Sequence, residues 1–310
     1  MTGFGHALVT GGAGFIGSHL TRTLLAAGQK VTVIDNLAVG RRHAVPDGAR
    51  FVHGDIRDEA AVANALSDVD CVFHLAAQVT IRGSFDRFYE DLDTNVMGTA
   101  RLLRMVDPAR VKWFTLASSM AVYADAPAPA PISESHATTP ISPYGIGKLA
   151  AEGVSRQILE ARGIPFSAVR YFNTFGPGQT YTPYVGVITI FVTRLIAGQD
   201  ITVFGDGEQQ RDFVHVDDIA AGTLATIGRT PGTYNLGTGR GTSLNQLAAL
   251  LIGRLAPEQR AAHAPPQAGE LRYSIADISA ARRALGYQPT RSLEADLDDV
   301  IADIRARPLS

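Results

Sequence analysis

The sequence predicts an α/β fold with a doubly wound parallel sheet and a smaller C-terminal lobe. Short apolar runs alternate with amphipathic segments from the first residues onward, which is typical of parallel strands joined by right-handed helical crossovers. After the first apolar run, Gly11, Gly14 and Gly17 follow at three-residue spacing, where a buried strand would turn into a helix. At 310 residues the chain suits one large domain or two intimate ones.

The expected strands are the short apolar runs 7–10, 31–35, 50–53, 71–75, 111–117 and 166–170. Ile16, Leu20 and Leu24 recur at four-residue spacing and predict the first helix, which would end at Gly28. Two longer helices are expected over about 93–106 and 142–162. The stretch 124–143 is rich in Ala and Pro, and we interpret it as a surface loop within one domain.

Beyond Phe172 the pattern becomes irregular, with several Gly, Pro and Tyr residues. We therefore expect two parts. Residues 1–172 with about 211–236 would form the larger, dinucleotide-binding domain. About 173–210 with 237–310 would form the smaller, substrate-binding lobe.

The composition is that of a soluble globular protein, with 45% hydrophobic and 19% charged residues. A formal charge of -2 gives no reason to expect nucleic acid or an anionic membrane as a partner. The single cysteine, Cys71, excludes an internal disulfide and is expected to be a buried strand thiol. No apolar run is long enough for a membrane span, and no basic leader is recognised, so we expect a cytoplasmic protein.

The glycine turn predicts a dinucleotide site, because a strand-to-helix turn of this kind receives a pyrophosphate. Asp35 ends the second expected strand, 18 residues after Gly17, where a carboxylate accepts hydrogen bonds from the adenosine ribose. That carboxylate would repel a 2'-phosphate, so NAD is favoured over NADP. Arg41 and Arg42 would reverse this preference unless they are solvated loop charges.

Tyr144 and Lys148 lie one helical turn apart and predict an acid-base pair for hydride chemistry on an alcohol or ketone. A free phenol has a pKa near 10 and is a poor base at neutral pH. Lys148 and the positive nicotinamide ring would favour the phenolate. Ser119, which ends a strand, is the expected third member, with Ser118 as its rival.

At these residues the chain resembles an extended short-chain dehydrogenase/reductase of the NAD-dependent epimerase/dehydratase family, similar to UDP-glucose 4-epimerases. The resemblance runs nearly end to end. It is carried by the ordered motifs at 10–17, 35–37, 54–57, 74–78, 95–99, 118–123, 144–148, 170–173 and 210–218.

The resemblance implies a Rossmann domain with tightly held NAD and a nucleotide-sugar substrate, most commonly a UDP-sugar. Tyr144 would take the proton of the sugar 4-hydroxyl, and hydride would pass from C4 to NAD and return to the other face of a transient 4-keto sugar. The implied NAD-binding residues are Gly11, Gly14, Phe15, Ile16, Gly17, Asp35, Asn36, Asp55, Ile56, Leu75, Ala76, Ala77, Asn95, Tyr144, Lys148 and Tyr171. The implied substrate-binding residues are Ser119, Tyr144, Asn173, Val187, Thr202, Phe204, Arg211, Glu270 and Ser274.

Two of these substrate residues also have structural explanations. The alternative for Phe204 is a simple core residue, and the alternative for Arg211 is a structural ion pair with Asp212.

Met120 and Ala121 bear on which reaction the chain performs. Dehydratases and decarboxylases of the family resemble one another in placing an acid directly after the active serine or threonine, or within two positions. Met120 and Ala121 transfer no protons, which favours epimerisation. The alternatives are a nucleotide-sugar dehydratase, a 4-keto reductase or a UDP-glucuronate 4-epimerase, and more remotely a non-catalytic NAD-binding regulator.

The substrate side departs from the family in two places. Gln267 stands where family epimerases commonly have a second diphosphate-binding Arg, and Arg272 is a possible substitute. Ser274 stands where many relatives have a bulky Tyr, so we expect room for an N-acetyl group and acceptance of UDP-N-acetylglucosamine as well as UDP-glucose. Residues 179–184 hold no Arg of the kind found in uronate-specific relatives.

No metal site is expected, because His6, His53, His74 and His215 lack ligand spacing. His74 is interpreted as a hydrogen-bonded strand residue. The helices at 93–106 and 142–162 match the pair through which relatives dimerise as a four-helix bundle, so a homodimer is expected.

Overall fold

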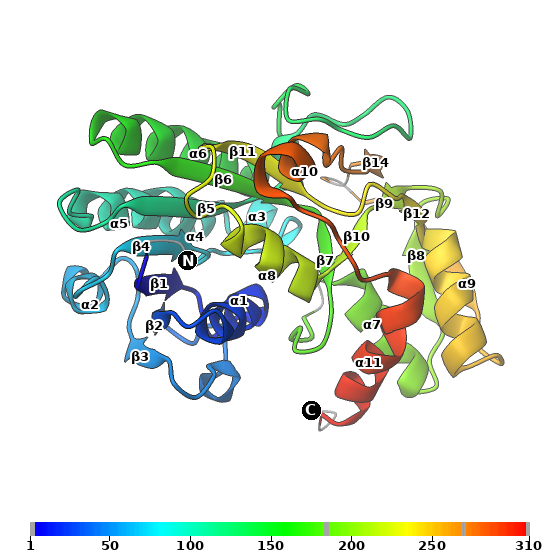
Figure 1. The fold of residues 1–310 in the computed structure, drawn as a ribbon. Helices are drawn as coiled ribbons and strands as arrows, with labels where there is room; N and C mark the ends of the chain where they lie inside the picture. The colour runs from blue at the N-terminus through cyan, green and yellow to red at the C-terminus, as the bar shows by residue number, and fades with distance from the viewer. Residues whose placement is uncertain (1–3, 183–185, 268, 270, 308–310) are drawn as a thin grey trace.

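The computed structural model describes residues 4–182, 186–267, 269 and 271–307. Within this part of the chain, seven parallel strands form the main sheet in the order β11-β6-β5-β4-β1-β2-β3 (Figure 1). They are β1 (His6–Thr10), β2 (Lys30–Asp35), β3 (Arg50–His53), β4 (Cys71–His74), β5 (Trp113–Ser119), β6 (Phe166–Tyr171) and β11 (Gly232–Leu236). From β1 the chain runs outward through β2 to β3, then crosses to β4 and continues through β5 to β6. The predicted doubly wound parallel sheet is confirmed.

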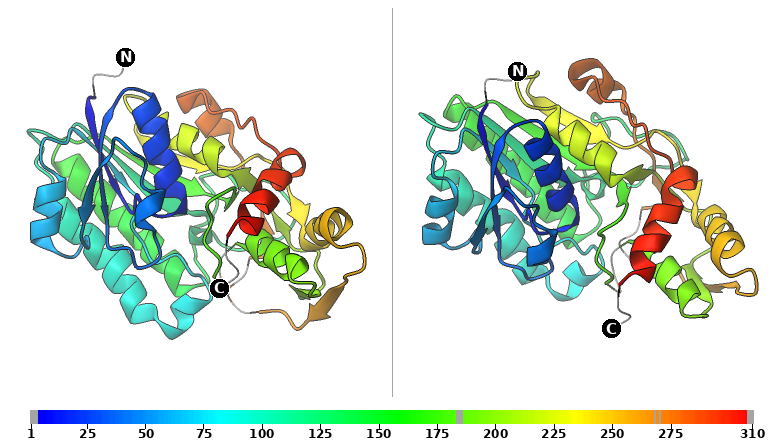
Figure 2. Two further views of the ribbon diagram at one scale, coloured as in Figure 1. Left: turned by 90° about the horizontal axis from the view of Figure 1, so that it is seen from below. Right: turned by 60° about the horizontal axis from the view of Figure 1, so that its bottom comes forward.

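Helices cover both faces of this sheet (Figure 2). On one face lie α2 (Glu59–Ala65), α5 (Thr99–Met105) and α6 (Pro143–Ala161), and on the other lie α1 (Phe15–Ala26) and α8 (Val216–Leu224). Successive strand residues serve opposite faces, as the period of a strand requires. Leu8 packs in the cluster of α5 and α6, whereas Val9 packs with Leu20 and Leu24 of α1. Cys71 is buried, as predicted.

The helix expected from residue 93 begins earlier and contains a π-helical turn. It runs through α4 (Phe88–Leu92), the π-helical η2 (Asp93–Gly98) and α5. Strand β5 extends two residues beyond its predicted end, because Ser118 and Ser119 still pair with Arg170 and Tyr171 of β6. This extension carries the polar end of β5 to the carboxyl edge of the sheet, where ligands bind in doubly wound folds.

The second lobe has its own apolar core, to which Phe175, Phe191, Val203, Leu247 and Leu297 contribute. Figure 1 shows this lobe beside the carboxyl edge of the main sheet. The elements around this core and beside it are β7 (Asn173–Phe175), α7 (Val187–Ile196), β8 (Ile201–Phe204), β9 (Gln210–Arg211), β10 (Phe213–His215), β12 (Thr242–Ser243), α9 (Leu244–Leu255), β13 (Ala261–Ala264), β14 (Tyr273–Ser274) and α11 (Leu293–Arg305). Strand β10 falls in the range predicted for the first domain, yet its Phe213 packs in this core.

The remaining elements are short, namely η1 (Arg42–Ala44), α3 (Gly83–Asp86), η3 (Met120–Val122) and α10 (Ser279–Leu285). Although α10 follows the second lobe in sequence, it packs against β11, and Ala281 and Leu285 join the core beneath the main sheet. The proposed division into two parts remains a prediction. Among the described residues, no helix combines the length and the apolar character needed to cross a membrane.

Candidate active site

One cavity of about 800 Å³ runs between the carboxyl edge of the main sheet and the second lobe. Every described residue that the sequence predicted for the site lines this cavity, except Asn95 and Ser274. Glu270 lies outside the described residues. The predicted NAD-binding and substrate-binding residues therefore meet in one continuous space, although they come from positions spread over most of the chain.

The glycine turn forms the end of the cavity nearest β1. Gly11 has φ +70°, and a Cβ there would lie 2.8 Å from the backbone nitrogen of Ala76. A Cβ at Gly17 would collide with the carbonyl oxygen of Gly11. Helix α1 begins directly behind this turn, so its unpaired N-terminal N–H groups and positive dipole end face the cavity. The turn is thus shaped to bring backbone N–H groups close to a pyrophosphate.

Asp35 connects β2 to the glycine turn. Its carboxylate accepts hydrogen bonds from the backbone N–H of Ala13 at 3.0 Å and of Leu37 at 2.8 Å. Each oxygen keeps a second lone pair for a ribose hydroxyl. The guanidinium of Arg42 lies over the Phe51 ring, 4.7 Å from its centroid, and neither Arg41 nor Arg42 is among the cavity-lining residues. This arrangement supports NAD over NADP.

Asp55 is held by Arg57, which donates two hydrogen bonds of 2.8 Å to its carboxylate. Asn36 donates a further one at 2.8 Å. The hydrogen bonds from Arg57 lower the pKa of Asp55 to about 2, although its burial opposes the shift. Asp55 is therefore a fixed, ionised acceptor at the end of the cavity where adenine is expected.

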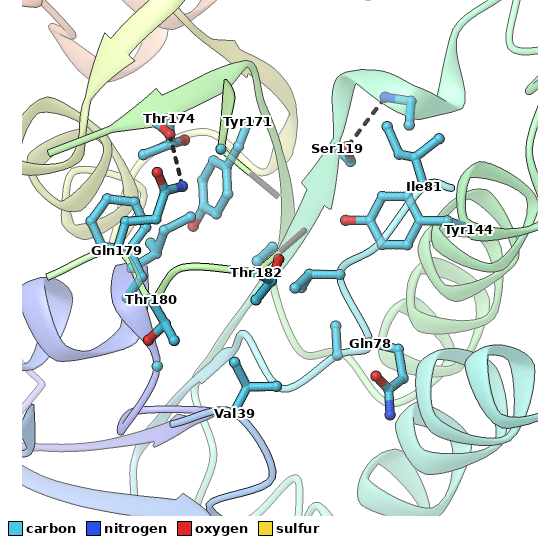
Figure 3. A pocket seen from close by; sticks show the side chains of 18 of the residues that line it. Val39, Gln78, Ile81, Ser119, Tyr144, Tyr171, Thr174, Gln179, Thr180 and Thr182 are labelled. Atoms are coloured by element: carbon cyan, nitrogen blue, oxygen red, sulfur yellow. Dashed lines mark hydrogen bonds between the residues drawn. The ribbon is translucent and has the colours of Figure 1, made fainter. Parts of the chain in front are cut away.

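Tyr144 and Lys148 lie on the first turns of α6, which begins with Ser142 accepting a hydrogen bond from the Gly145 N–H at 3.1 Å. Figure 3 shows the Tyr144 phenol pointing into the cavity on the side where Ser119 ends β5. Burial raises the pKa of this phenol to about 12, and the neighbouring Ser119 hydroxyl opposes the shift. The protein groups alone therefore keep Tyr144 protonated at neutral pH.

Lys148 donates a hydrogen bond of 3.0 Å from Nζ to the carbonyl oxygen of Ala117. Burial lowers the pKa of Lys148 to about 8, and the carboxylates of Asp91 and Glu152 oppose this shift. The ammonium is thus held at the end of β5, where Lys148 lines the cavity.

The two adjacent serines differ in what their hydroxyls contact. Ser118 donates to Glu152, which also accepts hydrogen bonds of 2.9 and 2.7 Å from Arg170 in a buried ion pair. Ser119 remains available to Tyr144. This difference favours Ser119 over Ser118 as the third member of the site.

Asn95 positions a loop and is not among the cavity-lining residues, so its predicted contact with the cofactor stays a prediction. Its side chain accepts a hydrogen bond from the Gln78 N–H at 2.8 Å and donates one to the Gln78 carbonyl at 3.1 Å. Gln78 does line the cavity. Asn95 lies on the π-helical turn beside this loop. Its amide oxygen and its amide nitrogen both bind the backbone of Gln78.

Ser274 is also placed differently from the prediction. It is fully buried on β14, its hydroxyl oxygen has no hydrogen-bond partner, and it is not among the cavity-lining residues. Its carbonyl accepts a hydrogen bond from the backbone N–H of Asp212, which holds β14 against the segment that carries Arg211. Ser274 therefore lies behind the wall of the cavity, and its predicted contact with the sugar stays a prediction.

Arg272 does not reach the cavity either. It makes two hydrogen bonds of 2.8 Å to Asp206 at the surface, so it is not the substitute for the missing guanidinium at Gln267. Gln267 itself lines the cavity.

Asp212, the expected alternative partner of Arg211, accepts hydrogen bonds from Thr238, Gly239 and Ala276.

Two cavity-lining arginines escaped the sequence analysis. Arg82 follows β4 and lies over the Phe204 ring, 4.9 Å from its centroid. Arg194 is the only charged residue in the otherwise largely apolar α7. The single charge of Arg194 in an apolar helical segment could have identified it from the sequence. The contact between Arg82 and Phe204 joins residues far apart in the chain, and no sequence pattern indicates it.

His74 is a buried, neutral strand residue, as expected. Its ring nitrogens hydrogen-bond the hydroxyls of Thr10 at 2.7 Å and Thr99 at 2.9 Å. Burial lowers its pKa to about 3. Within the described part of the chain no cluster of His, Cys, Asp or Glu has the form of a metal site.

Known proteins match the chain along nearly its whole length. The putative UDP-glucose 4-epimerase of Methanocaldococcus jannaschii is 35% identical, with 95% of this chain and 96% of that protein covered. The crystal structure of UDP-glucose 4-epimerase with UDP-glucose from Thermotoga maritima matches with a TM-score of 0.92 and 36% identity, covering 97% and 98% of the two chains. The UDP-N-acetylglucosamine 4-epimerase of Methanobrevibacter ruminantium, in complex with UDP-N-acetylmuramic acid, matches with a TM-score of 0.91 and 30% identity, covering 99% of each chain.

Residues 7–237 match the model of the NAD dependent epimerase/dehydratase family. The matched range includes the glycine turn, Ser119, Tyr144 and Lys148, which meet in the cavity. The chain belongs to the NAD dependent epimerase/dehydratase family.

Proposed function

We propose that this chain is an NAD-dependent nucleotide-sugar 4-epimerase that acts on UDP-sugars through a transient 4-keto sugar. The observation that carries the proposal is the meeting of Ser119, Tyr144 and Lys148 in a cavity that also contains the glycine turn. Relatives named as UDP-glucose 4-epimerases support the reaction class.

The cavity fits NAD by the shape of its glycine turn and by its donor groups. The residues that would hold it are the turn 11–17 at the pyrophosphate, Asp35 at the adenosine ribose, and Asp55 with Ile56 at the adenine. Lys148 and Tyr171 would face the nicotinamide half. NAD, when bound, supplies a reversible hydride acceptor and a positive nicotinamide ring that favours the Tyr144 phenolate.

Tyr144 is assigned as the proton carrier for the sugar 4-hydroxyl. Ser119 would orient the reacting oxygen and stabilise the phenolate by hydrogen bonding. Lys148, held on Ala117, would keep positive charge near the phenol. Because the proton returns to the same oxygen after the sugar presents its other face, one Tyr suffices for both halves of the reaction.

The carboxylates that line the cavity are distant in sequence from Ser119 and Tyr144. Among the described lining residues the only carboxylates are Asp35 and Asp55, both at the ends of β2 and β3. Met120 and Ala121 also line the cavity, directly after Ser119. The described residues therefore offer no carboxylic acid beside Ser119 to assist loss of water, which favours epimerisation over dehydration.

The exposed apolar side chains support a homodimer. Phe88, Tyr89, Met97, Ile146 and Ile158 are five of the ten exposed large hydrophobic residues of the described chain. All five lie on α4, η2 and α6, and α4 packs against α6. We propose that this helical face pairs with a second copy as a four-helix bundle. A cytoplasmic location also remains our proposal.

The test uses purified protein without added cofactor, incubated in turn with UDP-glucose, UDP-N-acetylglucosamine, UDP-glucuronate and dTDP-glucose. Proton NMR and mass spectrometry read the products. A new sugar signal set at unchanged mass would establish the epimerase and identify its sugar and base. A product lighter by one water would contradict the proposal, as would turnover that requires added reduced cofactor.

A further inference from the structure

Arg194 is a cavity-lining arginine without an internal partner. It lies near the C-terminal end of α7, its Nε is sealed from solvent, and no described group accepts a hydrogen bond from that nitrogen. No carboxylate pairs with its guanidinium among the described residues. Other arginines of the chain are satisfied internally, such as Arg170 by Glu152 and Arg272 by Asp206. A desolvated guanidinium nitrogen without an acceptor is unfavourable, and a ligand in the cavity would supply the missing acceptor.

The charge around Arg194 indicates the sign of that ligand. Arg211 also lines this half of the cavity, and Gln267 is neutral. The described carboxylates of the lining, Asp35 and Asp55, belong to the first domain. Among the described lining residues, the second lobe thus contributes arginines and no carboxylate, and an anion is the ligand that suits a guanidinium.

The position of Arg194 narrows the choice of anion. The pyrophosphate of NAD is expected at the glycine turn in the first domain. Tyr144 and Ser119, where the reacting sugar carbon must lie, also belong to the first domain. Arg194 instead lies on α7, which packs against β8, the strand that carries Thr202 and Phe204 to the expected nucleobase. The anion at Arg194 thus lies on the nucleotide side of the substrate.

A second unsatisfied group lines the same cavity. The amide oxygen of Asn173 is buried, and no described residue donates a hydrogen bond to it. Arg194 and Asn173 come from α7 and β7, so the two unpaired polar groups are contributed by different elements of the second lobe. Both residues line the one cavity, so each unsatisfied group is available to a ligand bound there.

We propose that Arg194 binds the diphosphate of the nucleotide-sugar substrate and supplies the cationic contact that Gln267 does not make. This inference rests on the proposed function, because it assigns a residue to that substrate. A planar guanidinium suits the task, since it contacts two phosphate oxygens at once.

The experiment compares Arg194→Gln with the wild type, both loaded with NAD. Isothermal titration measures the affinities for UDP and for uridine. We expect the affinity for UDP to fall about tenfold or more and that for uridine to stay within about twofold, because only UDP carries the charged group. The KM for UDP-glucose should rise by a similar factor while kcat changes little. Arg229→Gln, an exposed residue outside the cavity, is the matched control.

Arg194→Lys guards against a folding defect in the glutamine variant. It keeps the positive charge and loses the planar fork, so we expect a UDP affinity between those of the wild type and Arg194→Gln. Equal UDP affinity in all three proteins would overturn the inference. So would a loss confined to UDP-glucuronate, because Arg194 would then recognise a sugar carboxylate.

The two proposals fail in different ways. If the wild type binds UDP but turns over no UDP-sugar, the proposed function is wrong, and the comparison of UDP with uridine still judges Arg194. If the wild type epimerises a UDP-sugar and Arg194→Gln binds UDP normally, only the assignment of Arg194 is wrong.

Discussion

Ser118 and Ser119 are neighbours on β5, but their hydroxyls contact different partners. Ser118 donates to the buried carboxylate of Glu152, whereas Ser119 faces the phenol of Tyr144. Both serines line the cavity, but the alternation of side chains along a strand directs their hydroxyls to different partners.

Replacing each serine by alanine should therefore have opposite consequences. Ser119→Ala should lower kcat by about 10²-fold with little change in stability, because it removes a hydrogen bond to the reacting groups. Ser118→Ala should lower the free energy of unfolding by about 1–3 kcal/mol, since Glu152 loses a buried donor, and should leave kcat within a few fold. Steady-state kinetics and urea unfolding measure both. The reverse pattern would make Ser118 the active serine.

Tyr144→Phe removes the proposed proton carrier while keeping the ring. We expect kcat to fall by about 10²–10⁴-fold or more, and NAD to remain bound, because the other residues of the cofactor site are unchanged. Product formation by NMR and absorbance of the bound cofactor report the two quantities separately. Tyr181→Phe, a half-exposed tyrosine that also lines the cavity, is a matched control. Full activity in Tyr144→Phe would refute the mechanism.

Asp91 gives a prediction about the pH dependence of stability. Burial raises its pKa to about 6 from the model-compound value of 3.8, and one of its oxygens has no hydrogen-bond partner. The folded state thus holds this proton more tightly than the unfolded state. The associated stability is present below pH 3.8 and is lost as the pH rises through about 6. The free energy of unfolding of the wild type should therefore fall by about 1–2 kcal/mol relative to that of Asp91→Asn when the pH is raised from about 4 to about 8. Chemical unfolding of both proteins at the two pH values measures this difference.

The same substitution should change the pH profile of activity. The Asp91 carboxylate opposes the lowering of the Lys148 pKa, which stands at about 8. Without that carboxylate the pKa of Lys148 falls further, so activity that depends on the ammonium should be lost at lower pH on the alkaline side. Measuring kcat/KM from pH 6 to pH 10 tests this. Asp86→Asn, an exposed carboxylate of the same segment, should leave the profile unchanged. An unmoved alkaline limb in Asp91→Asn would show that Asp91 does not support Lys148.

Charge on the exposed helical face should separate the proposed dimer. Tyr89→Glu combined with Ile146→Glu places unpaired carboxylates where apolar side chains would be buried between copies. Light scattering after gel filtration should give the monomer mass of 32.9 kDa for this variant and about twice that for the wild type. Ala262→Glu, on exposed β13 of the second lobe, should leave the mass unchanged. A wild type that is monomeric at micromolar concentration would contradict the proposal.

The sequence by itself determined the parts of this protein that local patterns encode. Apolar runs and helical spacing located six of the seven strands of the main sheet, all except β11. The strand–glycine–helix pattern located the dinucleotide turn, and the four-residue spacing placed Tyr144 and Lys148 on one face of α6. Each of these features depends on residues that are close in the chain. The spacing of apolar, glycine and polar residues therefore predicts them through the geometry of strands and helices alone.

Only the tertiary structure decided what several side chains contact. Asn95 holds the Gln78 loop, Ser274 lies behind the cavity wall, and Arg272 pairs with Asp206. Arg194 lines the cavity, and its Nε finds no acceptor among the described residues. These outcomes join segments far apart in the sequence through strands as short as two residues, β9 and β14, which are too short to carry a periodic signal. Packing of the second lobe against the main sheet, rather than local propensity, selects which of the polar residues there reach the ligand.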